Sequence, residues 1–139
     1  MPESRKKILL VEDEPGIVNP LALELRQRGF EILIARNGEE GVRIAEAERP
    51  ALIVLDIMLP DMNGITVAKR LAERMEAGGN RATPIMFLTS RDDAETISRA
   101  LSGGEYDYLL KSEWKLDDLA EKIAAKANAA DAEGAGAAR

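Results

Sequence analysis

The sequence predicts an α/β fold in which helices cover both faces of a doubly wound, five-stranded parallel sheet. The first observation is a set of short apolar runs rich in β-branched residues, 8–11, 52–55 and 85–88, which are typical of strands buried on both faces. The second is that segments with a helical apolar spacing separate these runs, as in successive βαβ units. Right-handed connections are expected between such strands. A length of 139 residues suits one domain of this kind.

Local signals set the expected element boundaries in the first half of the chain. Pro15 suits the first position of a helix that Gly29 ends. An alternating segment, 31–35, predicts the second strand. Asn37, with Glu40 three residues later, predicts a capping box at the start of the second helix.

The later elements continue the same alternation. They are expected as a third helix over 65–75, a fourth strand after Pro84, a fourth helix capped by Asp92 and Glu95, a fifth strand over 106–110 and a fifth helix over 116–127. Five strand–helix pairs make a flavodoxin-like (βα)5 arrangement. Residues 1–127 form the expected domain. Residues 128–139, rich in Ala and Gly, are expected to be a frayed helix end or a linker stub with no output domain after it.

Polar or charged residues follow the apolar runs. Glu12 and Asp13 follow the first run, Asp56 and Thr89 follow those at 52–55 and 85–88, and Lys111 follows Tyr108-Leu109-Leu110. Because the C-terminal ends of parallel strands share the edge where open α/β sheets bind ligands, we expect these groups to meet. Each alone has a simpler interpretation, such as a turn cap, an acidic loop or a solvated lysine. Their combination favours phosphoryl transfer.

The chemistry of these groups supports that interpretation. An aspartate carboxylate can attack phosphorus and hold the product as an acyl phosphate, so Asp56 is the expected nucleophile. Three crowded carboxylates raise one another's pKa values unless a cation joins them, and Mg²⁺ is the cation that takes oxygen ligands and bridges to phosphate. Lys111 is expected to stabilise the charge on the phosphoryl oxygens.

In order and spacing, four stretches resemble the receiver domain of two-component response regulators, here as a single-domain response regulator. They are Val11-Glu12-Asp13-Glu14, Asp56-Ile57-Met58-Leu59-Pro60-Asp61-Met62-Asn63-Gly64, Leu88-Thr89-Ser90 and Asp107-Tyr108-Leu109-Leu110-Lys111. The resemblance covers residues 6–127, and the second stretch is its most specific part. It implies a phosphorylation-activated signalling switch, with no enzymatic activity beyond its own phosphotransfer and slow autodephosphorylation.

The resemblance also implies individual roles. Asp13 and Asp56 would bind Mg²⁺ directly, Glu12 would act through water, and the backbone carbonyl of Met58 would contribute. Thr89 would bind the arriving phosphoryl group and move toward Asp56. Tyr108 would then turn inward as the second switch residue, and the signal would leave through the face made by the fourth helix, fifth strand and fifth helix. From the residues alone, Tyr108 would be a core aromatic with its hydroxyl at the surface.

The chain departs from the family after Lys111. There the family usually has proline, often in a cis peptide bond, followed by an aromatic residue, whereas this chain has Ser112-Glu113-Trp114. A cis bond before serine would cost about 2.5–4 kcal/mol, so a trans bond is expected. The loop into the fifth helix should therefore be rebuilt, with Trp114 covering the space of the missing aromatic.

The amino-acid composition limits the classes of partner and the location that we expect for this chain. The chain has no histidine, so a partner histidine kinase or histidine phosphotransfer protein must supply any phosphohistidine. Its net charge of −6 gives no general reason to bind nucleic acid or an anionic membrane. There is no cysteine, signal-peptide core or membrane-spanning apolar run, so we expect a cytoplasmic protein. The downstream protein is unknown, and a monomer or weak dimer is expected.

Other functions fit less well. A receiver-like interaction module that works without phosphorylation would be favoured by loss of an acid, of Asp56 or of Lys111, and all are present. An aspartyl-phosphate phosphatase commonly needs a second acid two residues after the nucleophile, where this chain has Met58. A nucleotide-binding fold would want a glycine-rich first turn, but residues 12–14 are acidic.

Overall fold

The computed structural model describes residues 5–78, 83–89, 107–111 and 115–137. Within these ranges the chain forms one sheet of five parallel strands with the order β2-β1-β3-β4-β5. The strands are β1 (Lys7–Val11), β2 (Glu31–Ala35), β3 (Leu52–Asp56), β4 (Ile85–Thr89) and β5 (Asp107–Leu110). The predicted doubly wound sheet is therefore confirmed.

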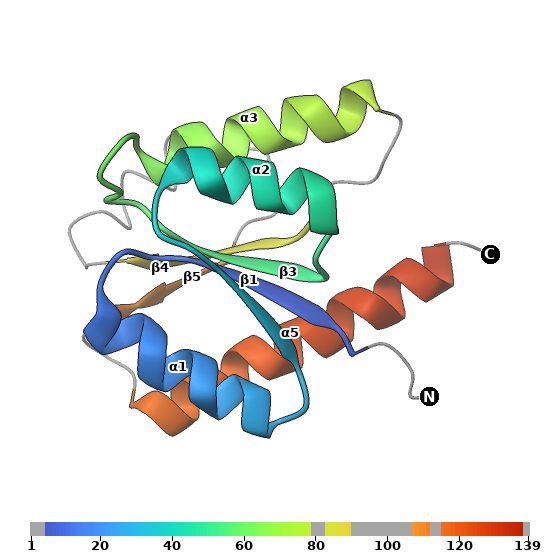
Figure 1. Ribbon diagram of the computed structural model, residues 1–139. Coiled ribbons are helices and arrows are strands. Elements are labelled where there is room, and N and C mark those ends of the chain that lie inside the picture. Colours follow the sequence, from blue (N-terminus) through green and yellow to red (C-terminus); the bar gives the residue numbers. More distant parts are fainter. Residues whose placement is uncertain (1–4, 79–82, 90–106, 112–114, 138–139) are drawn as a thin grey trace.

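Four helices are described: α1 (Pro15–Gln27), α2 (Gly38–Glu48), α3 (Gly64–Ala77) and α5 (Leu116–Ala137). Figure 1 shows α2 and α3 on one face of the sheet and α1 and α5 on the other. The fourth helix expected after Asp92 lies outside the described residues, as does the segment at 112–114 that replaces the family's proline. In the described ranges, no helix carries an apolar stretch long enough to cross a bilayer.

Two apolar layers hold the helices against the sheet. On one face, side chains such as Leu10 and Val54 pack with Leu21 of α1 and Ile123 of α5. On the other face, side chains from β1, β3 and β4 pack with α2 and α3; among them are Leu9, Leu55, Phe87, Val42 and Leu71. The three central strands are buried on both faces because each alternates its side chains between these two layers.

β5 is less buried than its apolar sequence predicts. Asp107 and Tyr108 are exposed, and Leu110 is only partly buried. The physical reason is position, because β5 is the terminal strand of the sheet and pairs with β4 on one side only. Tyr108 keeps 43% of its surface exposed, so it is not the core aromatic expected from the residues alone.

The helix start at Pro15 and the Asn37 cap are confirmed, and the predicted capping box forms only in part. Pro15 is the first residue of α1, and the Asn37 side chain accepts a hydrogen bond from Glu40 N at 2.8 Å at the start of α2. The Glu40 side chain accepts in turn from Arg36 N at 2.8 Å. The bond to Asn37 satisfies an amide that the first turn of a helix leaves without a partner. Glu40 accepts from Arg36 N, one residue before the cap, and not from the Asn37 N of a capping box, and this bond places the start of α2 beside the end of β2.

Candidate phosphoryl-transfer and metal site

The C-terminal ends of four strands bring the predicted site residues to one edge of the sheet. Val11 of β1 is opposite Leu55 of β3, so Glu12 and Asp56 follow at matching positions. Asp56 is in turn opposite Leu88 of β4, which places Thr89 next along that strand. Lys111 follows directly after β5. This convergence is the one that a parallel sheet predicts.

Three carboxylates form the acidic cluster of the site. Glu12 and Asp56 are buried, with exposed fractions of 3% and 4%, and Asp13 is exposed. One carboxylate oxygen from each residue lies within 4.8 Å of the others. The backbone of Glu12 is held in place because its N–H donates to Ala35 O at 3.0 Å. Its side chain is held by a second hydrogen bond, in which Oε2 accepts from Glu14 N at 3.2 Å. With two buried carboxylates and an exposed third, the cluster suits a divalent cation that enters from solvent.

Lys111 is shared among three acids. Its Nζ donates to Asp56 Oδ2 at 3.2 Å and to Glu14 Oε1 at 2.9 Å. Lys111 Nζ also lies 3.1 Å from Glu12 Oε1. These two atoms form an ion pair, but their relative orientation does not make a hydrogen bond. Burial works to lower the pKa of Lys111, but the hydrogen bond that Lys111 donates to Glu14 and the charges of Asp56 and Glu12 outweigh it and raise that pKa. The ammonium is therefore charged whenever the acids are.

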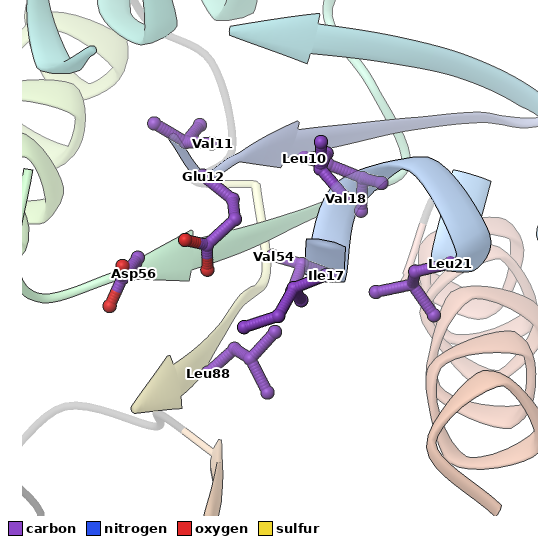
Figure 2. Close-up of a pocket in the computed structure, with 9 residues that line it drawn as sticks. All are labelled: Leu10, Val11, Glu12, Ile17, Val18, Leu21, Val54, Asp56 and Leu88. Atoms are coloured by element: carbon purple, nitrogen blue, oxygen red, sulfur yellow. The ribbon is translucent and has the colours of Figure 1, made fainter. Parts of the chain in front are cut away.

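Burial raises the pKa of Glu12 to about 7, and the nearby charge of Asp56 adds to the rise, while Lys111 opposes it. Figure 2 shows the cause of the burial, with Ile17, Val54 and Leu88 lining the space beside the Glu12 carboxylate. The cavity there has a volume of only about 10 Å³. This cavity is too small to hold a phosphoryl group.

Two buried oxygen atoms at the site have no hydrogen-bond partner in the described part of the chain: Glu12 Oε1 and Thr89 Oγ1. Thr89 is fully buried at the end of β4. Leaving a buried polar atom unpaired costs about 1–3 kcal/mol, so such atoms call for an explanation. Glu12 Oε1 already lies 3.1 Å from the Lys111 ammonium, which balances part of its charge, and an anion that accepts from the Thr89 hydroxyl would satisfy Thr89 Oγ1.

The loop between β3 and α3 lies directly against Asp56. Met58 N donates to Asp56 Oδ1 at 3.3 Å, and Met58 pairs with Asn63 in an isolated bridge. Gly64 N donates to Ile57 O at 2.7 Å, and a Cβ on Gly64 would overlap the carbonyl oxygen of Asp56. Position 64 thus requires glycine because the backbone there approaches Asp56 closely.

Sequence reasoning missed three residues that shape the site. Asn63 caps α3 by accepting from Ile65 N at 2.7 Å, and its place before a helical apolar pattern was a usable signal. Glu14 contacts Lys111, and Asp61 accepts hydrogen bonds from the start of α2. No local sequence pattern predicts the contacts of Glu14 and Asp61, because their partners lie 97 and 22–23 residues away in the sequence.

The sequence matches the family profile of the response regulator receiver domain over residues 8–124. The chain belongs to this family. It is 41% identical over 106 residues to the alkaline phosphatase synthesis transcriptional regulatory protein PhoP of Bacillus subtilis, a match that covers 76% of this chain and 42% of that protein. It is 33% identical over 126 residues to the DNA-binding response regulator MtrA of Mycolicibacterium smegmatis, covering 91% of this chain and 52% of the relative. The chain thus spans about half the length, or less, of these two relatives.

Solved receiver structures share the fold. A CheY-like receiver domain protein from Methanospirillum hungatei superimposes with a TM-score of 0.74 at 30% identity, covering 94% of this chain and 99% of that one. The response regulator TrrA from Thermotoga maritima, solved in complex with Mg²⁺ and BeF, has a TM-score of 0.70 at 31% identity, covering 87% of this receiver and 98% of TrrA. These likenesses confirm the signalling class and the fold predicted from the sequence.

Proposed function

We propose that this receiver is a phosphorylation-activated switch that accepts a phosphoryl group on Asp56 from the phosphohistidine of a partner kinase or phosphotransfer protein. The observation that carries the proposal is the Asp56 carboxylate itself. It is buried at a strand end, 3.2 Å from the Lys111 ammonium, and it shares a cluster with two further acids. Membership of the receiver family supports the same function.

In the proposed step an Asp56 carboxylate oxygen attacks phosphorus, and the bond from phosphorus to the partner's imidazole nitrogen breaks. The electron pair of that bond stays on the nitrogen, and Asp56 becomes an acyl phosphate. Lys111 stands where it neutralises charge on the phosphoryl oxygens, and Thr89 offers a hydroxyl hydrogen bond to one of them. Slow loss of the group to water would return the resting state.

The residues present fit Mg²⁺. Following the family resemblance, Asp13 and Asp56 would bind it directly, Glu12 would act through water, and the Met58 backbone carbonyl would complete the protein ligands. Their donors are all oxygens, as Mg²⁺ prefers, and Glu12 Oε1 is a buried atom without a hydrogen bond in the described part of the chain. Bound there, the ion would neutralise carboxylate and phosphoryl charge together. The presence of Mg²⁺ in the TrrA complex supports the choice of ion.

The signal would leave through Thr89 and Tyr108. Thr89 lies at the end of β4 with a hydroxyl that has no hydrogen-bond partner among the described residues, and Tyr108 lies exposed on the neighbouring strand β5. Phosphorylation would draw the Thr89 hydroxyl toward Asp56 and favour an inward Tyr108, shifting two pre-existing states. Amide chemical shifts with and without beryllofluoride test this route. Changes over residues 92–118 are expected, and changes confined to the Asp56 pocket would contradict it.

The downstream partner is proposed to be a protein. MtrA is a DNA-binding regulator, but this chain matches only about half of it and carries a net charge of −6. An acidic receiver surface gives no electrostatic reason to bind nucleic acid. A cytoplasmic monomer or weak dimer that contacts a kinase and a downstream protein is the form we propose.

Phosphoramidate tests the central step because its phosphorus–nitrogen bond resembles that of phosphohistidine. Intact mass should rise by one phosphoryl group in the presence of Mg²⁺ and stay unchanged with EDTA or in Asp56→Asn. If wild type and Asp56→Asn gain the same mass, the assignment of Asp56 is wrong. If neither gains mass while Mg²⁺ binds, the alternative of an interaction module that works without phosphorylation is favoured.

A further inference from the structure

We propose that Asp61 is a positioning residue for the metal-binding loop: its carboxylate ties the β3–α3 loop to the first turn of α2 and so sets the position of the Met58 carbonyl. The inference rests on the proposed function, because it gives a role to a residue that supports the metal site without touching it. Asp61 lies in the loop between Asp56 and Gly64, three residues after Met58.

Both oxygens of Asp61 are used in this tie. Oδ1 accepts from Gly38 N at 2.7 Å, and Oδ2 accepts from Glu39 N at 2.9 Å. These two amides belong to the first turn of α2, where helix N–H groups have no partner within the helix. The two backbone hydrogen bonds lower the pKa of Asp61, which shows that they favour its ionised form. A carboxylate at a helix N-terminus is the favourable sign of charge for the helix dipole.

Side-chain packing reinforces the tie. A Cβ on Gly38 would overlap Met62 Cγ, so the chain after Asp61 lies directly on the start of α2. A Cβ on Gly41, one turn further, would come within 3.1 Å of Val11 in β1. The first turns of α2 therefore contact both the β3–α3 loop and the end of the strand that leads into Glu12. The β3–α3 loop, which carries Met58, and the end of β1, which leads into Glu12, therefore pack against the same turns of α2.

Met58 depends on this support more than Glu12 and Asp56 do. Glu12 and Asp56 are buried and extend from strand ends, but Met58 is 68% exposed. Packing of its side chain cannot fix the backbone of Met58, so its carbonyl depends on the loop anchors. One anchor is the hydrogen bond from Met58 N to Asp56 Oδ1, and a second is the cap of α3 by Asn63, which also pairs with Met58. A third is Asp61 on α2.

The test compares Mg²⁺ affinity in Asp61→Asn with affinity in wild type. Asn keeps the size of the side chain and one acceptor oxygen, but its amide nitrogen cannot accept from Glu39 N. Asp118→Asn is the matched control, because Asp118 is an exposed aspartate in the first turn of α5 and loses the same charge. Asp13→Asn, a proposed direct ligand, is the positive control for weakened binding.

Titration with Mg²⁺, followed by amide NMR shifts well below the melting temperature, gives affinity separately from stability. We expect Asp61→Asn to bind Mg²⁺ about tenfold more weakly, the low end of the loss seen for residues that support ligands from outside the coordination shell. Asp118→Asn should match wild type. Altered Gly38 and Glu39 amide shifts would show that the tie itself is broken.

Two outcomes would overturn the proposal, and they are distinguishable. If Asp61→Asn shifts the Gly38 and Glu39 amides and melts lower, but binds Mg²⁺ as wild type does, Asp61 serves the fold alone. If wild type itself shows no Mg²⁺-dependent shifts at residues 12, 13 and 56–58, the metal site fails first, and the role of Asp61 fails with it.

Discussion

Lys111 lies closer to Glu14 than to Asp56: its Nζ is 2.9 Å from Glu14 Oε1 and 3.2 Å from Asp56 Oδ2. The two contacts differ in environment, because the Glu14 side chain is 58% exposed and the Asp56 side chain is 5% exposed. Solvent weakens the Glu14 pair, and exposed ion pairs typically contribute about 0–1 kcal/mol. The shorter contact is therefore the weaker one, and Glu14 holds the ammonium near the cluster without binding it firmly.

This difference predicts unequal effects of two substitutions on the resting protein. Lys111→Met leaves buried acids without their cation and should destabilise the protein by about 3 kcal/mol, at the low end for breaking a buried pair. Glu14→Gln should change stability by less than about 1 kcal/mol. Urea unfolding without divalent ions measures both. Equal losses would contradict this ranking of the two contacts.

The raised pKa of Glu12 predicts that the stability of the metal-free protein depends on pH. Its ordinary pKa of 4.5 is raised to about 7 in the folded protein. Between these values the folded state holds a proton that the unfolded state has lost, so the free energy of unfolding falls as pH rises. At about 1.4 kcal/mol per pKa unit, the fall is about 3 kcal/mol by pH 8. Unfolding at pH 5–8 should show this slope in wild type, and Glu12→Gln should flatten it.

Removing one acid should raise stability before metal arrives. Glu12, Asp13 and Asp56 place like charges within one cluster. Asp56→Asn or Asp13→Asn should therefore melt higher than wild type without divalent ion, because repulsion among the remaining acids is smaller. Mg²⁺ should raise the melting temperature of wild type more than that of either variant, since a ligand that binds only the folded state stabilises it. Equal shifts in all three proteins would mean that these acids do not form a metal site.

Gly64 should tolerate no side chain. An added Cβ would meet the carbonyl oxygen of Asp56 and lie 2.9 Å from Ile57 Cα, both of which are backbone atoms. Gly64→Ala should destabilise the protein by about 1–3 kcal/mol, as overpacking does, and should weaken Mg²⁺ binding by displacing Asp56. Gly16→Ala is the matched control. Its Cβ would meet nothing within 4 Å in α1, so the alanine should be neutral or stabilising. Similar losses in both variants would contradict the steric explanation.

The sequence predicts much of the frame of the site because the frame follows from short-range patterns. Apolar runs that end in Glu12, Asp56 and Thr89 predict both the strands and the edge where their ends meet. The Asn37 cap was predictable for the same reason, since its partner Glu40 lies three residues away. These features need only the period of the pattern and the common direction of parallel strands.

The remaining features depend on which elements become neighbours in space. The exposure of Tyr108 follows from the terminal place of β5 in the sheet, which the apolar character of its own sequence does not reveal. The contacts of Glu14 with Lys111 and of Asp61 with α2 join segments far apart in the chain. Exposed acids of this kind resemble ordinary loop residues until the partner amide or ammonium is placed beside them.

Locating the phosphoryl group tests the central claim most directly. The receiver would be phosphorylated with phosphoramidate and Mg²⁺, treated with borohydride to reduce any acyl phosphate to an alcohol, and digested for peptide mass analysis. The account predicts that reduction converts residue 56 to homoserine in wild type, and that the same peptide from Asp56→Asn or from an EDTA-treated sample is unmodified. Reduction at Glu12 or Asp13 with Asp56 unchanged, or a stable phosphoryl group on Thr89, would contradict it.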